Sequence, residues 1–412
     1  MPAPSPRRDL WANTDFVKLW AASSVSIFGS LVTRTALPFT AILVLHATPL
    51  QMAALGAADL ASQFLVGLPA GLWVDRLRRR PIMIAADLGR AAVLLSVPLA
   101  AFLGVLRIEH LYAVAFLAGV LTIFFDVADQ SYLPTVVRRE QLLAANSTLA
   151  ASASVSEVAA FGVGGWLVQW LTAPVAILVD AASFVGSALF VGAIGTPEPP
   201  PAPTPQRSLR AEMAEGFRAV WRNPVLRATA GCSMTANLSF RIFSAVFLLY
   251  TTRELGVAPG VQGMIFAVGG VSSLVGAVLA GRIARAIGVG PAMIAGVTLM
   301  GLSLLLVPLA RDAAPVALMF LVAQQFGDGA FVVYDVTQVS LRQSVTPDRL
   351  LGRVNGSIRV AVLGAMLIGV LLGGALGEAL GLRVALVVAG GGTLLASLWL
   401  ILSPVRTLRI HP

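Results

Sequence analysis

Twelve stretches of the chain are apolar and long enough to cross a lipid bilayer as α-helices. A transmembrane helix must supply roughly 20 mostly apolar residues to cross about 30 Å of hydrocarbon. Of the 412 residues, 57% are hydrophobic and only 12% are charged, whereas a soluble chain usually has about a quarter of its residues charged. We therefore expect an all-α integral membrane protein. The twelve expected transmembrane helices lie near residues 16–43, 50–73, 81–105, 110–133, 144–171, 174–195, 225–250, 260–285, 289–310, 314–338, 354–379 and 382–403.

The basic residues are distributed unevenly between the two sides of the membrane that these helices define. Of the 29 lysines and arginines, 21 fall on the side that holds the N-terminus and four on the other side. Cytoplasmic loops carry an excess of basic residues, so both termini are expected in the cytoplasm. The same asymmetry explains the net charge of +9 without a nucleic acid partner. Near-absence of lysine among the basic residues is typical of a GC-rich bacterial genome, so we expect a multi-pass protein of a bacterial inner membrane.

Residue counts exclude several kinds of catalytic site. The single cysteine, Cys232, allows neither an intrachain disulfide nor a cysteine metal cluster. The three histidines form no HExxH pair, and the only lysine, Lys18, is not part of a P-loop. We expect no metal, no cofactor and no enzymatic activity. A membrane-embedded enzyme or sensor is the distant alternative, and it would need an extramembrane domain that the longest loop is too short to form.

The longest polar stretch divides the twelve expected helices into six and six. It opens with a proline-rich segment, which forms a stiff spacer. Residues 209–221 are then apolar at helical spacing and basic, which predicts a short helix on the inner membrane surface. The expected domains are an N-terminal six-helix bundle (1–195), a cytoplasmic linker (196–222) and a C-terminal six-helix bundle (223–412).

Small residues recur at the same spacing in both halves. Stripes of small residues let helix backbones approach closely in lipid. The stripes lie 209 residues apart, so a duplication is favoured over chance, and the halves are expected to form two pseudo-symmetric bundles in parallel repeat. The first stripe is Ser152, Ser156, Ala160 and Gly164, and the second is Ala361, Ala365, Gly369 and Gly373.

The loop between the second and third expected helices carries a recognisable motif. It reads Gly71-Leu-Trp-Val-Asp75-Arg76-Leu-Arg78-Arg79-Arg80, which resembles the GxxxDRxGRR signature of the major facilitator superfamily, with Arg78 in place of the second glycine. Other patches resemble the bacterial twelve-helix exporters of drugs, macrolides and siderophores. They include Asp15-Phe-Val-Lys-Leu-Trp20 and Asp180-Ala-Ala-Ser-Phe184.

This resemblance implies a secondary transporter that works by rocker-switch alternating access between its two halves. In the exporter branch, it implies proton-coupled export of small amphiphilic compounds, with a small-molecule substrate, protons and the lipid bilayer as partners. One chain suffices for this architecture, so we expect a monomer. A proton symporter or uniporter that imports a small metabolite stays open as the alternative. The conformational latch that the resemblance implies consists of Gly71, Asp75, Arg76, Arg79 and Arg80.

Ionisable residues inside the expected helices should have a partner or a function, because an ionised group in hydrocarbon costs about 2.5–3.5 kcal/mol or more. Consecutive helices are antiparallel, so two residues equally far from the connecting loop lie at the same depth. Arg90, Asp126, Asp87 and Asp129 are thereby expected to form one cluster near the inner face, close to Asp75 and Arg76. The matched pairs are Arg34 with Asp59, Arg90 with Asp126, Asp87 with Asp129, and Asp335 with Arg359. A static ion pair without a transport role is the alternative for each of these matches, and it is the favoured interpretation for Asp335 with Arg359.

Three acids have no basic residue matched to them. A buried carboxyl group without a fixed cation can load and release a proton near neutral pH. Asp328 and Glu157 are the first proton-coupling candidates, and Asp180 is a third, although a packing role fits Asp180 better. A protonated acid bonded to a backbone carbonyl is the alternative for each.

Polar residues also line one face of the first and seventh expected helices. In the superfamily these helices border the central cavity, so we expect a substrate cavity there. Its candidate residues are Ser30, Arg34, Asn237 and Arg241. Nearby phenylalanines could contact a flat apolar substrate, but lipid-facing packing is the more common role for such residues.

Overall fold

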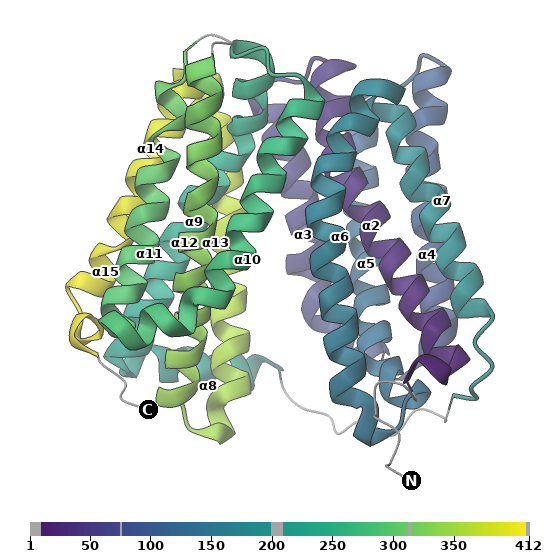
Figure 1. The fold of residues 1–412 in the computed structure, drawn as a ribbon, viewed down its shortest axis with the longest axis horizontal. Coiled ribbons are helices and arrows are strands. Elements are labelled where there is room, and N and C mark those ends of the chain that lie inside the picture. Colours follow the sequence, from purple (N-terminus) through teal and green to yellow (C-terminus); the bar gives the residue numbers. More distant parts are fainter. Residues whose placement is uncertain (1–9, 75, 199–208, 312–314, 409–412) are drawn as a thin grey trace. The chain divides into compact units, whose positions relative to one another are not determined.

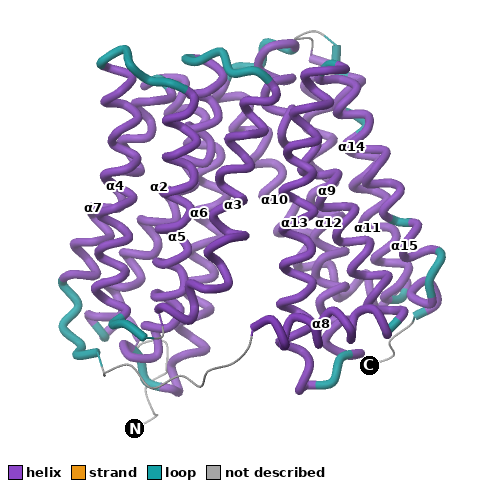
Figure 2. Tube along the Cα trace, turned by 180° about the vertical axis from the view of Figure 1, so that it is seen from behind, coloured by secondary structure: helices purple, strands orange, loops and turns teal. Residues whose placement is uncertain are grey.

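The computed structural model describes residues 10–74, 76–198, 209–311 and 315–408 (Figure 1). Within these ranges, all regular secondary structure is helical, and short loops join successive helices (Figure 2). Twelve long helices lie where the sequence predicts them. They are α2 (Thr14–Leu43), α3 (Pro49–Val74), α4 (Arg79–Phe102), α5 (Ile108–Val136), α6 (Leu142–Leu171), α7 (Ala173–Gly192), α9 (Pro224–Leu249), α10 (Pro259–Ile287), α11 (Val289–Leu304), α12 (Pro315–Val345), α13 (Asp348–Leu380) and α14 (Leu382–Ala396).

Ten of these helices, some with the short helix that follows, are long and apolar enough to span a membrane. The bent helix α6 makes eleven if its two parts count as one span, and α3 is the remaining long helix. The predicted all-α transmembrane fold is therefore confirmed. The remaining elements are short: η1 (Arg139–Gln141), α8 (Leu209–Arg222), η2 (Tyr250–Glu254), η3 (Val307–Leu309), α15 (Leu398–Ile401) and η4 (Pro404–Thr407).

The first long helix of each half begins with the same cap. Asn13 accepts hydrogen bonds from the backbone N–H groups of Asp15 and Phe16, at 3.1 and 3.2 Å. Asn223 does the same for the two residues that follow Pro224, at 2.9 and 3.3 Å. An asparagine at this position satisfies N–H groups that the first helical turn leaves unpaired. Both caps fix where their helix starts.

The chain forms two compact units, Met1–His46 with Ala58–Pro205 and Ala47–Ala57 with Gln206–Pro412. In the first unit, α2 packs against α6 and α7, and α4 packs against α5 and α7. In the second, α9 packs against α13 and α14, and α11 packs against α12 and α14. The pairing repeats after a shift of six transmembrane helices, as expected for pseudo-symmetric bundles. The predicted domain boundaries stay a prediction, because the first turns of α3 group with the second unit.

The predicted small-residue stripes lie at helix contacts of different closeness. A Cβ at Gly373 on α13 would lie 2.7 Å from the Ile242 carbonyl oxygen and 2.8 Å from its Cα. At the matching Gly164 on α6, the nearest atoms would be the Thr35 Cβ at 3.6 Å and the Val32 Cα at 3.7 Å. The backbone of α13 therefore touches α9, whereas α6 leaves room beside α2.

This difference makes a paired prediction for Gly373→Ala and Gly164→Ala. We expect Gly373→Ala to destabilise the protein by about 1–3 kcal/mol, because the added methyl group collides with the backbone of α9. Gly164→Ala should change the stability little. Thermal unfolding of both variants in detergent checks this expectation, and equal loss of stability in the two would contradict the packing described here.

The short helix predicted in the linker is α8, and one side of it packs on protein. Val220 is buried in a cluster with Leu226, Ala230, Val354 and Ile358. An ion pair between Arg353 and Glu215, and a 3.1 Å hydrogen bond from the Ser357 hydroxyl to the Met213 carbonyl, also hold α8 against α13. One side of α8 therefore packs on protein while Phe217 and Trp221 are exposed, and the expected position on the inner membrane surface stays a prediction.

Candidate functional site

A buried arginine lies at the centre of the first unit. Arg90, on α4, is 1% exposed, and its guanidinium carbon lies 4.4 Å from the ring centre of Phe125 and 3.9 Å from that of Phe184. Stacking on aromatic rings suits a desolvated guanidinium. Arg90 forms an ion pair with Asp87, one turn earlier on the same helix, and donates a 3.4 Å hydrogen bond to the Ser26 hydroxyl on α2.

Three carboxyl groups lie near this arginine, and a fourth lies beside two of them. Asp87 and Asp180 are buried, with 0% and 1% exposure. Arg90 also interacts electrostatically with Asp126 and Asp180. Asp129 has Asp126 and Asp87 as charged neighbours and accepts a 3.2 Å hydrogen bond from Ser23. We call these residues the Arg90 cluster: Arg90, Asp87, Asp126, Asp129 and Asp180.

The charges of the Arg90 cluster do not balance. One guanidinium cannot compensate four ionised carboxylates in a low-dielectric interior, where each uncompensated charge costs several kcal/mol. Among the described residues, the Asp87 Oδ2 and Arg90 Nε atoms have no hydrogen-bond partner. Asp126 is exposed at the surface of its unit. A set of carboxyls that exceeds its cations, with one member at the protein surface, is suited to bind and release protons.

The second unit lacks this arrangement at the matching positions of α12. Asp335 and Gln338 stand 209 residues after Asp126 and Asp129. The Gln338 amide donates a 3.2 Å hydrogen bond to the Asp335 carboxylate. A neutral amide therefore replaces the second carboxyl, and Asp335 has a fixed donor. The excess of carboxyls is a property of the first unit.

The structure brings together the four residues of the predicted cluster, with two differences. The direct ion-pair partner of Arg90 is Asp87 rather than Asp126, because residues three apart on a helix share a face. Asp180, which sequence reasoning left without a cation, lies within the electrostatic reach of Arg90. Its carboxylate accepts a 3.1 Å hydrogen bond from Ser183.

Asp75 lies outside the described residues, so its predicted proximity to the Arg90 cluster stays a prediction. Arg76 is exposed. In the described ranges, Arg76 forms no contact with the Arg90 cluster.

The residues of the other two predicted pairs are exposed. Arg34 and Asp59 lie on α2 and α3, and their pairing stays a prediction. Asp335 interacts with Arg342, two turns along its own helix, while Arg359 is exposed on α13. The depth argument predicts only the level of a residue in the membrane. It does not determine whether two helices turn their side chains toward each other.

The acid predicted on α12 is enclosed without a cation. Asp328 is partly buried, and a Cβ at Gly269 on α10 would lie 2.7 Å from its Oδ2 atom. The nearby Gln325 amide donates instead to the Ile265 carbonyl, at 2.7 Å. Within the ranges described, neither a basic side chain nor a hydrogen-bond donor reaches Asp328. Glu157, the other first candidate, is exposed on α6.

The predicted cavity residues lie on α2 and α9. Ser30 is partly buried and Arg34 is exposed in the first unit, while Asn237 and Arg241 are partly buried in the second. Asn237 donates a 2.9 Å hydrogen bond to the Ser233 carbonyl. Their role in a substrate cavity stays a prediction.

The phenylalanines of α9 belong to the interior of the second unit. Phe243 and Phe247 are each 4% exposed, and their ring centres lie 4.8 Å apart. Phe243 and Phe247 therefore do not face lipid, and their contact with a substrate stays a prediction.

The arginines of the loop motif hold the inner end of the first unit together. Glu198 accepts hydrogen bonds from the backbone N–H groups of Arg79 and Arg80, at 2.6 and 3.2 Å. Arg80 also donates a 3.2 Å hydrogen bond to the Val191 carbonyl at the end of α7. The surroundings of Gly71 are not described by the structure. A latch role for the motif therefore stays a prediction, whereas the tie between α4 and α7 is formed.

A second acid fastens the same segment to α2. Asp15 accepts hydrogen bonds from the Thr196 backbone N–H and hydroxyl, at 2.9 and 2.7 Å, and from the Gly195 N–H. The sequence analysis assigned no role to Asp15 or Glu198. The available signal was that both acids lie near helix ends, where backbone N–H groups lack partners within the helix.

Comparison with known proteins extends over nearly the whole chain. The model of a family described as transmembrane secretion effectors matches residues 10–410. The multidrug efflux pump Tap of Mycolicibacterium fortuitum is 29% identical over 261 residues, which cover 58% of this chain and 63% of that protein. The uncharacterized major-facilitator-type transporter YfiS of Bacillus subtilis strain 168 is 25% identical over 83% of this chain and 82% of its own length.

Solved structures share the fold at low sequence identity. The nucleoside transporter NupG superposes with a TM-score of 0.78 at 14% identity, over 94% of this chain and 98% of that chain. A bacterial homologue of the human lysosomal transporter Spinster has a TM-score of 0.71 at 15% identity, with 100% of both chains covered. With the family match across residues 10–410, the chain belongs to the transmembrane secretion effector family of major facilitator transporters.

Proposed function

We propose that this protein is a proton-coupled exporter of small amphiphilic compounds, and that the Arg90 cluster carries the coupling proton. The observation that carries the proposal is the excess of carboxyls around a single buried guanidinium in the first unit. The similarity to a multidrug efflux pump favours export. The distribution of basic residues supports a topology with both termini in the cytoplasm of a bacterial cell.

Asp129 is the proposed proton carrier within the cluster. Its neighbouring charges are carboxylates, and its hydrogen-bond partner is a hydroxyl, so no cation among the described residues holds it in the ionised form. Loss of the proton from Asp129 would add a negative charge beside Asp126 and Asp87. Such a charge biases the equilibrium between two conformations, and alternating access of the two units would convert that bias into transport.

Asp328 is a second proposed proton site, in the other unit. It is enclosed by α10 without a described cation, as sequence reasoning requires of a carrier. Glu157 and Asp180 are weaker candidates, because the first is exposed and the second accepts a hydrogen bond close to Arg90.

Two assays test the function and its direction. Cells that express the protein in a strain lacking its own efflux pumps should resist one or more compounds of an amphiphile panel. Everted membrane vesicles should then accumulate that compound when the vesicle lumen is acidified. Proton-driven movement of the compound out of the lumen would instead identify an importing symporter, and resistance without any pH dependence would contradict proton coupling.

A further inference from the structure

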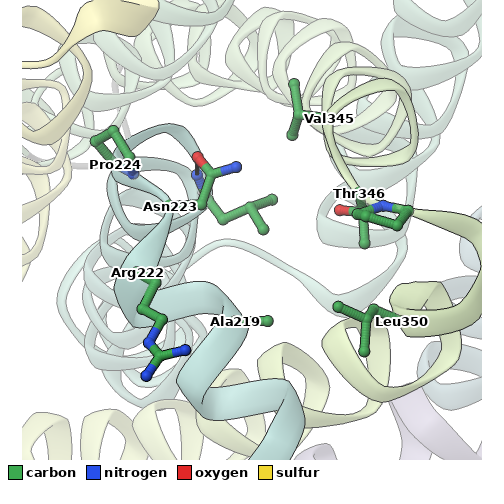
Figure 3. Close-up of a pocket in the computed structure, with 9 residues that line it drawn as sticks. Ala219, Arg222, Asn223, Pro224, Val345, Thr346 and Leu350 are labelled. Atoms are coloured by element: carbon green, nitrogen blue, oxygen red, sulfur yellow. Dashed lines mark hydrogen bonds between the residues drawn. The ribbon is translucent and has the colours of Figure 1, made fainter.

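A pocket of about 410 Å³ opens at one end of the second unit, where α8 meets the start of α9 (Figure 3). Arg222 and Asn223 lie on one wall, and Thr346 and Leu350 lie on the opposite wall (Figure 3). The segment between α12 and α13 closes the far side. The pocket is lined by Ala219, Arg222, Asn223, Pro224, Leu226, Val345, Thr346, Pro347 and Leu350.

The pocket contains polar groups that the fold does not use. Thr346 is only 6% exposed, yet its hydroxyl has no hydrogen-bond partner in the described part of the chain. The side-chain oxygen of Asn223 accepts the hydrogen bonds that cap α9, so the side-chain nitrogen remains able to donate. Burial of an unpaired hydroxyl is unfavourable, so such a group indicates that something else bonds to it.

Basic residues and two helix starts flank the pocket, beside one exposed acid, Asp348, in the first turn of α13. Arg222 on its wall is exposed, and both α9 and α13 begin beside it. Helix N-termini attract negative charge. Arg227 lies one turn into α9, with its guanidinium carbon 5.9 Å from the ring centre of Trp221. Glu215, an acid on α8, is paired with Arg353.

The free face of α8 has the composition of a helix at a lipid headgroup layer. Phe217 and Trp221, four residues apart, are 42% and 72% exposed, and Arg218 and Arg222 are exposed beside them. Aromatic rings concentrate at membrane–water interfaces. Basic residues on the cytoplasmic side are drawn to anionic lipids, with about 1 kcal/mol gained per residue near the surface.

We propose that this pocket binds the phosphate-bearing headgroup of an anionic phospholipid of the cytoplasmic leaflet. The Arg222 guanidinium would bind the phosphate, while the Thr346 hydroxyl and the Asn223 amide complete its hydrogen bonds. Phe217 and Trp221 would lie among the acyl chains and headgroups next to it. A lipid so bound would join α8 to the α12–α13 connection, independently of how the protein moves its substrate.

Native mass spectrometry of the purified full-length protein, titrated with dioleoyl-phosphatidylglycerol or dioleoyl-phosphatidylcholine, tests this proposal. We expect tighter binding of the phosphatidylglycerol. Arg222→Ala should weaken that binding by about tenfold, and Thr346→Val by about fivefold. The phosphate loses a charged donor, the guanidinium, in the first case and a neutral donor, the hydroxyl, in the second. Arg285→Ala, which removes an exposed arginine from the inner end of α10, is the control and should leave it unchanged.

Fluorescence gives a second measurement that does not depend on the pocket variants. Dibrominated phosphatidylglycerol should quench the wild-type protein more than dibrominated phosphatidylcholine does, and Trp221→Phe should remove that difference. Equal binding of the two lipids, or equal weakening by Arg222→Ala and Arg285→Ala, would overturn the proposal. Thermal stabilisation by inorganic phosphate alone that Arg222→Ala abolishes would also overturn it, because the ligand would then be a soluble phosphate compound.

Discussion

Arg90→Met is expected to destabilise the first unit by about 3–5 kcal/mol, the usual cost of removing one partner from a buried ion pair. The methionine preserves much of the apolar contact with Phe125 and Phe184, so the loss reports mainly on charge. Without the guanidinium, Asp87 stays buried with no cation at 0% exposure. Thermal unfolding of the detergent-purified protein measures the effect.

A second substitution should rescue this variant. Replacing both partners of a buried pair by neutral groups is often close to neutral in stability. We therefore expect Arg90→Met combined with Asp87→Asn to recover most of the lost stability. Arg359→Met, at an exposed arginine of α13, is the matched control and should unfold close to the wild type. If Arg90→Met is as stable as Arg359→Met, Arg90 does not hold the cluster together.

Asp129→Gln is expected to abolish proton-driven export while the protein still folds. The substitution places on α5 the residue that α12 already carries at Gln338, and the amide there is accommodated beside Asp335. An amide cannot take up and release the coupling proton, so drug resistance should fall by at least about tenfold, within the usual range of coupling energies. Resistance of expressing cells to the compounds found in the panel measures this.

The matched control for Asp129→Gln is Asp335→Asn on α12. Its carboxylate already has the Gln338 amide as a fixed donor, so export should stay close to the wild type. Asp328→Asn is informative beside it: loss of coupling there as well would mean that protons are handled in both units. Full resistance from cells with Asp129→Gln would assign the coupling elsewhere.

The fold was predictable from the sequence because hydrophobic length and loop charge act locally. Each long helix begins within two residues of its predicted start except α13, which begins six residues earlier, at Asp348. The repeated small residues also predicted correctly that α13 touches another helix at Gly369 and Gly373. The spacing of small residues does not predict how closely each stripe approaches the adjacent helix.

The site was only partly predictable. The sequence gives the depth of a residue in the membrane, but it does not give the direction in which the side chain points. Equal depth brought Arg90 and Asp126 together correctly as cluster members, but the same argument paired Asp335 with Arg359, which the structure does not join. The spacing of Asp87 and Arg90, three residues apart, was the available signal for their ion pair. The rings that enclose Arg90 come from α5 and α7, and no local pattern predicts that meeting.

The most direct test of the account compares two modes of transport in vesicles that contain the purified protein, using a compound found in the panel. Wild-type protein should show both accumulation of the compound against its gradient, driven by a pH difference, and exchange of labelled for unlabelled compound at equal pH. Asp129→Gln should retain exchange and lose the pH-driven accumulation. Accumulation that survives in this variant at the wild-type level would contradict the assignment of proton coupling to the Arg90 cluster.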